Sequence, residues 1–229
     1  MIIELNENSS NIKKYNFELT SDPIIFLETV SKKIICEIIG YYNDFGENPL
    51  QFRERTLTSV IFPALLKSSK RAATELYYYT ESKEKVNFLD YYAMDELREN
   101  AYLIEVKHLF LHNNESFRKH YEDKWIELEE QFKKLKKKDV NNYIDSNKNI
   151  YAISLAIIVP WFYSEKEKSI DYYKNYVKEK FNPDWLYTCD LRESDVYKIE
   201  FPDKDIYCPW IIFTGRIKTI ETAKINKKF

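Results

Sequence analysis

With 229 residues, of which 44% are hydrophobic and 31% charged, the chain is long enough to fold as one large domain around an extensive core. Aromatic residues make up 16% of the chain, which excludes a disordered protein, and the formal net charge of -2 gives no overall attraction to nucleic acid. The 3 glycines, Gly40, Gly46 and Gly215, are scattered, which argues against the glycine-rich phosphate loops of P-loop and Rossmann enzymes.

The cysteine pattern and the first residues bear on the cellular compartment. Cys36, Cys189 and Cys208 are odd in number, far apart and without a Cys-x-x-Cys spacing, which favours a reducing compartment and argues against structural zinc. The N-terminus lacks the basic segment and apolar stretch of a signal peptide, and the apolar runs are far shorter than a bilayer span. We therefore expect a cytoplasmic protein that does not enter a membrane.

The first half of the chain predicts two helices, after residues 1–20 that form either an edge strand or a loose arm. Asp22 followed by proline marks the start of a helix over 24–42, because Asp is a good N-cap and proline fits the first turn. Asn48 followed by proline is a start signal of the same kind and predicts a second helix over 48–65, with a kink at Pro63.

The second half alternates between strand and helix patterns. Short runs rich in aromatic and β-branched residues predict three antiparallel strands, and later apolar runs predict further strands. The strands are expected at 75–80, 86–93, 101–107, 151–163, 185–190, 196–201 and 206–214, with helices at 117–135 and 165–181 and a basic tail at 216–229. This order predicts a single α/β domain, 1–229, with a mixed central sheet flanked by helices.

Three charged residues on two adjacent strands are the main candidates for chemistry. Glu105 and Lys107 share one face of their strand, because side chains alternate along a strand. Asp90 lies fifteen residues before Glu105, an interval that fits two strands of a hairpin. Two carboxylates supply the oxygen ligands that Mg²⁺ prefers, and Lys107 is placed to assist phosphodiester hydrolysis. The alternative is a cross-strand ion pair between Lys107 and either carboxylate.

Residues on the preceding helix and after the Glu-x-Lys add secondary candidates. Glu54 is placed to aim a carboxylate at the metal, while Arg53, Arg55 and His108 are candidate phosphate contacts. The alternative is ordinary surface charge on an amphipathic helix and, for His108, a strand end facing solvent.

This combination resembles the PD-(D/E)xK, or restriction-endonuclease-like, nuclease superfamily, and in particular its bacterial members. The resemblance covers a core of about 48–163 and implies that Asp90 and Glu105 are metal ligands, Lys107 is the catalytic lysine and Glu54 is an accessory glutamate. The chain departs from the family pattern at the residue before Asp90, which is leucine in place of proline. Glu75, at the start of the first strand, is a rival for the role of Glu54.

The resemblance implies a Mg²⁺-dependent nuclease, with Mn²⁺ as a substitute metal, that acts on DNA in preference to RNA. Two other functions remain open. One is a catalytically idle protein of the same fold that binds nucleic acid; the other is a protein-interaction module that uses its abundant aromatic residues. A homodimer is left open as the assembly.

Overall fold

The structure, a computed structural model, describes residues 3–8, 22–51, 54–79, 86–97, 99–112, 115–135, 148–163, 168–200 and 204–220. Its helices are α2 (Pro23–Phe45), α3 (Glu54–Ser68), α4 (Glu115–Lys134) and α6 (Ile170–Phe181), with short 3-10 helices η1 (Pro49–Gln51) and η2 (Asp195–Tyr197). Its strands are β1 (Ile3–Asn8), β2 (Arg71–Tyr79), β3 (Val86–Met94), β4 (Asn100–Leu111), β5 (Asn149–Pro160), β6 (Trp185–Asp190), β7 (Lys198–Ile199), β8 (Ile206–Tyr207) and β9 (Trp210–Ile220).

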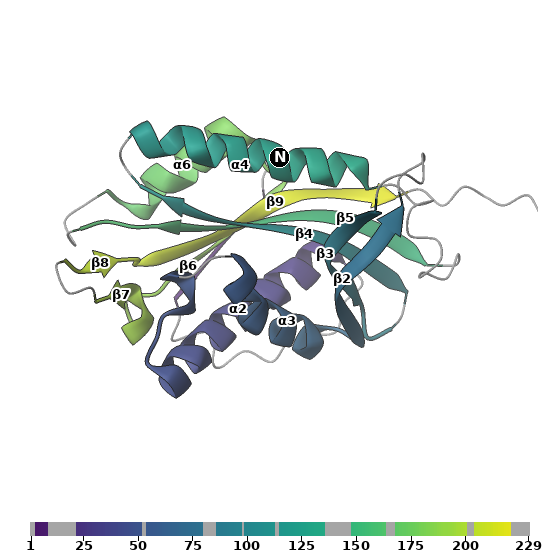
Figure 1. Cartoon of the computed structure of the whole chain (residues 1–229), viewed down its shortest axis with the longest axis horizontal. Coiled ribbons are helices and arrows are strands. Elements are labelled where there is room, and N and C mark those ends of the chain that lie inside the picture. Colours follow the sequence, from purple (N-terminus) through teal and green to yellow (C-terminus); the bar gives the residue numbers. More distant parts are fainter. Residues whose placement is uncertain are drawn as a thin grey trace, which may run out of the picture.

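A mixed seven-stranded sheet forms the centre of the fold, in the order β1-β6-β9-β5-β4-β3-β2. The β4–β5 and β1–β6 pairs are parallel, and the other neighbouring strands run antiparallel. Helices α4 and α6 cover one face and α2 and α3 cover the other (Figure 1). The predicted mixed α/β sheet with flanking helices is therefore confirmed.

Helix α2 begins and ends where the sequence predicts a cap. The Asp22 side chain accepts a hydrogen bond of 2.7 Å from the backbone N–H of Ile24, and the helix begins at Pro23. Gly46 ends it in the left-handed conformation, with φ of 70°, and donates its N–H to the carbonyl of Tyr42 at 2.7 Å. The helix is three residues longer at its C-terminal end than the predicted 24–42.

Several predicted boundaries were wrong. The second predicted helix is divided into η1 and α3, and Pro63 lies inside α3. The predicted strand 196–201 is instead η2 followed by the two-residue strand β7. The predicted strand 206–214 divides into β8 and β9. Of the predicted helix at 165–181, residues 165–167 lie outside the described part of the chain, residues 168 and 169 are not helical, and α6 begins at Ile170.

The predicted basic tail was wrong over residues 216–220, which belong to β9 and pair with β5. The two basic side chains in this stretch bind the C-terminal half of α4. Arg216 forms an ion pair with Glu129, and Lys218 donates to the carbonyl of Phe132 at 2.6 Å. A cation near the last carbonyls of a helix is favourable, so these charges belong to a packed strand and not to a tail.

The apolar core lies on both faces of the sheet, and β4 contributes to both. Tyr102, Ile104 and Val106 point toward α2 and α3, where Phe26 of α2 stacks on Tyr102 with ring centroids 3.8 Å apart. Leu103 and Leu109 belong to the clusters that pack beneath α4 and α6. The predicted alternation of β4 is therefore confirmed. None of the described helices combines the length and apolar character that crossing a bilayer requires.

Candidate functional site

A tight turn between β3 and β4 sets the register that brings the candidate residues together. Asp95 is buried in this turn and accepts hydrogen bonds from the backbone N–H of Glu99 at 2.9 Å and from the Asn100 amide at 2.8 Å. From this turn the strands pair as far as Tyr91 opposite Ile104. One further step in the same register places Asp90 opposite Glu105.

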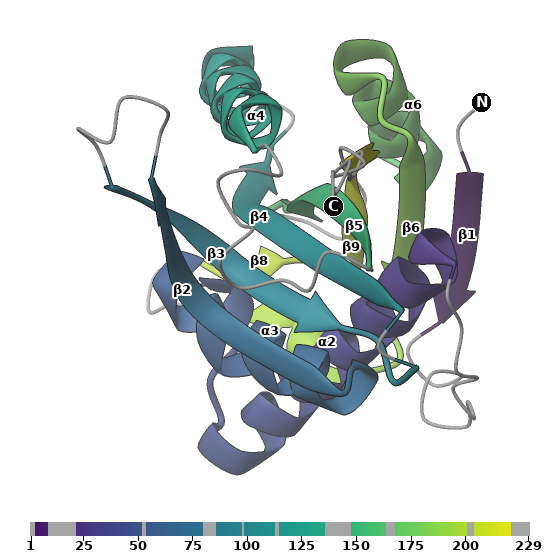
Figure 2. The ribbon, with the colours of Figure 1, turned by 90° about the vertical axis from the view of Figure 1, so that its right-hand side faces the viewer.

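The two strands separate at this point, and the Asp90 side chain bridges the opening. Its Oδ2 accepts a hydrogen bond of 2.7 Å from the backbone N–H of Val106. A carboxyl group therefore satisfies a strand amide that a neighbouring backbone carbonyl would otherwise satisfy. The N-terminal end of β3 swings away from β4 as the β2–β3 hairpin continues (Figure 2).

The Asp90 carboxyl lies next to the Glu105 side chain. Burial raises the pKa of Asp90 above its ordinary value, while the Val106 N–H, the charge of Lys107 and the interaction with Glu105 act in the opposite direction. The charge of Glu75 raises this pKa further. A buried carboxyl, Glu105, beside a half-buried one with a shifted pKa, Asp90, is typical of functional sites.

Lys107 has a partner that the sequence did not predict. Its Nζ lies 3.8 Å from Oε1 of Glu127 on α4. The Lys107 side chain is only 8% exposed, whereas that of Glu127 is 46% exposed and also binds Lys124 at 2.8 Å. Lys107, which the sequence predicts beside Asp90 and Glu105, is thus also held by an ion pair with α4, which packs over its face of the sheet.

Glu54 belongs to the other face of the sheet. It is the first residue of α3, which covers the face opposite to α4 (Figure 2), whereas Glu105 and Lys107 follow the alternation of β4 toward α4. Arg53 lies outside the described residues, and the side chains of Glu54 and Arg55 are outside them as well. The predicted roles of these three residues stay predictions.

An open cavity of about 400 Å³ lies at Asp90, on the α3 side of the sheet. Thr58 and Ile61 of α3 form one wall, and Glu75, Asp90 and Val106 contribute from the three strands. Two carboxylates, those of Glu75 and Asp90, therefore line a space that a ligand is able to enter.

Glu75 has an unusual backbone in the middle of β2. Its φ is 54°, which is uncommon for a residue with a side chain and destabilises the chain by about 1–2 kcal/mol. The β2–β3 ladder passes from Thr74–Tyr91 to Leu76–Leu89, so Glu75 lies across from Asp90. Irregular strand geometry of this kind is enriched near functional sites, and no local sequence signal marks it here.

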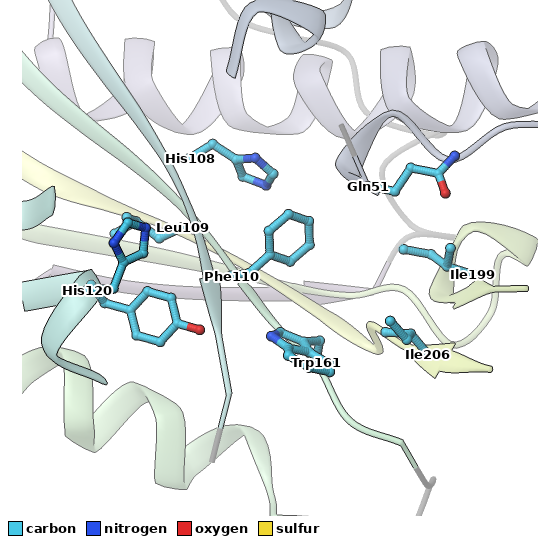
Figure 3. Close-up of a pocket in the computed structure, with 9 residues that line it drawn as sticks. Gln51, His108, Leu109, Phe110, His120, Trp161, Ile199 and Ile206 are labelled. Atoms are coloured by element: carbon cyan, nitrogen blue, oxygen red, sulfur yellow. The ribbon is translucent and has the colours of Figure 1, made fainter. Parts of the chain in front are cut away.

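A second cavity, of about 370 Å³, lies at the C-terminal end of β4 (Figure 3). His108, Leu109 and Phe110 of β4 line it together with Trp161, which follows β5. His108 is half-buried and meets the edge of Phe110, with ring centroids 4.6 Å apart. The structure therefore places His108 in an aromatic cavity, whereas Asp90 lines the other one.

The chemistry of Asp90 and Glu105 is compatible with a hard divalent cation. Both offer carboxylate oxygens and lie next to each other, and oxygen is the ligand that Mg²⁺ prefers. Over the parts of the chain that the structure describes, no three His, Cys, Asp or Glu side chains gather as a metal centre. The pair would supply two protein ligands, and water or substrate oxygens would complete the coordination of Mg²⁺.

Comparison with models of protein families, with curated proteins and with solved structures found no match for this chain.

Proposed function

We propose that this protein is a divalent-cation-dependent nuclease that hydrolyses phosphodiester bonds in DNA. The observation that carries the proposal is the pair of neighbouring carboxyl groups, Asp90 and Glu105, at the point where β3 and β4 separate, with Asp90 held by the Val106 N–H. The positive charge of Lys107 acts on this pair, and an open cavity adjoins Asp90. Paired carboxylates, a nearby positive charge and an opening at one of the carboxylates are parts that metal-assisted phosphodiester hydrolysis uses. The opening reaches Asp90 and Glu75, whereas Glu105 and Lys107 do not line it.

Asp90 and Glu105 would hold the cation, with Mg²⁺ as the first choice and Mn²⁺ as a substitute. When bound, such a cation polarises the phosphate and neutralises its negative charge. The hydrogen bond from Val106 fixes the orientation of Asp90, because a carboxyl group held by a backbone amide loses rotational freedom.

Lys107 would stabilise the extra negative charge that develops on the phosphate during hydrolysis. Its ammonium group is buried and held by Glu127, so it is positioned before the substrate arrives. Glu75 adds a second carboxylate on the cavity side of Asp90, which makes it a better-supported accessory residue than Glu54 in the described part of the site. DNA is the substrate class that the resemblance to PD-(D/E)xK nucleases favours, with RNA as the second choice.

Cleavage of plasmid and single-stranded DNA in Mg²⁺, with an EDTA control, tests the proposal. Asp90→Asn, Glu105→Gln and Lys107→Met should each reduce the cleavage rate by about 100-fold or more. Glu130→Gln is a matched control, because Glu130 is an exposed residue of α4 that pairs only loosely with Lys134, at 3.9 Å. Cleavage that persists in EDTA, or equal rates in all variants, would contradict the proposal.

A nucleic-acid-binding protein with an idle site is the second candidate function. The burial of Glu105 and Lys107, which are 1% and 7% exposed, favours it because a substrate phosphate must reach these groups. This candidate predicts binding that weakens steeply with salt and no cleavage in either Mg²⁺ or Mn²⁺.

A further inference from the structure

The aromatic cavity at the end of β4 begins one residue after the candidate catalytic lysine. His108, Leu109 and Phe110 follow Lys107 directly, and all three line the cavity (Figure 3). Leu109 shares the α4-facing side of β4 with Lys107 and lines the cavity together with Tyr121 of α4. Strands rise by about 3.3 Å per residue, so Leu109 lies about 7 Å along β4 from Lys107, which is within the reach of a nucleotide next to the one whose phosphate lies at Lys107.

A network of hydrogen bonds and ring contacts fixes the wall formed by Trp161. The Tyr121 hydroxyl accepts the backbone N–H of His112 at 3.2 Å and also bonds to the Trp161 indole. The His112 ring packs against Trp161 with centroids 4.3 Å apart. Trp161 is therefore held in place before a ligand binds, which lowers the cost of ordering it on binding.

The chemistry of the lining selects a flat, uncharged ligand with polar edges. Phe110 and Trp161 offer aromatic faces, and Ile199 and Ile206 add apolar surface. His108, His120 and Gln51 provide hydrogen-bonding groups at the margins, and no Asp, Glu, Lys or Arg is among the described residues that line the cavity. A phosphate has no strong partner here, whereas a nucleobase has both faces for stacking and edges for hydrogen bonding. The volume of about 370 Å³ lies within the range of small-ligand pockets.

We propose that this cavity binds an unpaired nucleobase of the substrate, adjacent to the phosphodiester at Lys107. A base inside a duplex has its faces stacked and its edges paired, so it has to leave the stack before it enters such a cavity. The preferred substrate is therefore single-stranded DNA, or a duplex that carries unpaired bases. The position of the cut next to the bound base rests on the proposed function. The binding of the base rests on the cavity alone.

Binding of fluorescent oligonucleotides to the full-length protein in EDTA tests the inference without cleavage. The wild type should bind a single strand more tightly than the same strand in a duplex and more tightly than an abasic strand of equal length. The loss on removing the bases should be about 5- to 150-fold, which corresponds to the 1–3 kcal/mol of stacking one base on an aromatic residue. A mononucleotide in excess should compete only weakly, because it lacks the neighbouring phosphates.

Two variants locate the effect in the cavity. Trp161→Leu and Phe110→Leu should lower the affinity for the normal single strand toward the affinity for the abasic strand. The affinity for the abasic strand itself should be the same in both variants as in the wild type. Phe45→Leu is the matched control, because Phe45 is 67% exposed at the end of α2 and lies outside this cavity. Equal binding of abasic and normal strands by the wild type would overturn the inference, and this comparison needs no variant to fold.

The inference and the proposed function fail in different ways. Base-dependent binding without Mg²⁺-dependent cleavage would reject the nuclease and leave the base pocket standing. Cleavage with equal rates on single strands and duplexes, unchanged by Trp161→Leu, would reject the pocket and leave the nuclease standing.

Discussion

Replacing Asp90 by asparagine should make the metal-free protein more stable while removing its activity. Asparagine keeps an oxygen that accepts the Val106 N–H, and its amide is able to donate to Glu105. The substitution removes a half-buried carboxyl whose ionised form is disfavoured, because loss of hydration outweighs the Val106 bond and the charge of Lys107. When a residue is retained for function at a cost in stability, its replacement commonly raises the free energy of unfolding by about 0.5–2 kcal/mol.

The size of this stabilisation depends on pH. The pKa of Asp90 is higher in the folded protein than in the unfolded chain. The carboxyl therefore stabilises the fold below the unfolded pKa of about 3.9, and this contribution is lost as the pH rises through the folded pKa. Asp90→Asn should match the wild type near pH 3 and exceed it at pH 7. A gain of about 1 kcal/mol corresponds to a rise of about 2–4 °C in melting temperature for a chain of this size.

Thermal melting in EDTA at several pH values measures the effect, and Asp190→Asn is a control of opposite sign. Burial would raise the pKa of Asp190, but the bonds from Arg192, at 2.9 and 3.0 Å from its Nε, outweigh burial and lower it. Asp190→Asn should therefore cost about 0.5 kcal/mol at pH 7, a cost that disappears as the pH falls through the folded pKa. If Asp90→Asn lowers the melting temperature at pH 7, Asp90 is a structural residue and the reasoning is refuted.

Two further predictions test the fold. Gly215→Ala should destabilise the protein by about 3 kcal/mol or more in denaturant unfolding, because the new Cβ would lie 1.7 Å from the backbone oxygen of Ser154. Gly40→Ala should instead stabilise α2 by about 0.5–1 kcal/mol, because a Cβ there would meet nothing within 4 Å. Equal effects of the two substitutions would contradict the close approach of β9 and β5. Burial raises the pKa of the Cys208 thiol to about 12, so iodoacetamide at pH 8 should label half-buried Cys36 in the native protein and Cys208 only after unfolding, as followed by mass spectrometry. Rapid labelling of Cys208 in the native protein would contradict the burial of this thiol.

The parts of the fold that the sequence predicts are those with strong local signals. Asp22 and Gly46 bracket α2 because capping chemistry depends on a few neighbouring residues. The common face of Glu105 and Lys107 follows from strand alternation alone. The end of β9 was missed because Arg216 and Lys218 read as a basic tail, and only the packed structure shows that they bind α4.

The strands that carry Asp90, Glu105 and Lys107 were predictable from the sequence, whereas the surroundings of these residues were not. The sequence placed Asp90 and Glu105 on neighbouring strands, but the separation of these strands depends on the register that the Asp95 turn sets. The pairing of Lys107 with Glu127 depends on how α4 docks, which periodicity does not define. The left-handed backbone of Glu75 has no signature, because it arises from long-range strand geometry.

Calorimetric titration of Mn²⁺ into the metal-free protein tests most directly whether Asp90 and Glu105 form a cation site. We expect one ion to bind per chain, and we expect Asp90→Asn and Glu105→Gln each to weaken binding by at least about 10-fold, while Glu130→Gln leaves it unchanged. If Mn²⁺ does not bind, or if it binds equally well to the wild type and to both site variants, the proposed metal site is wrong.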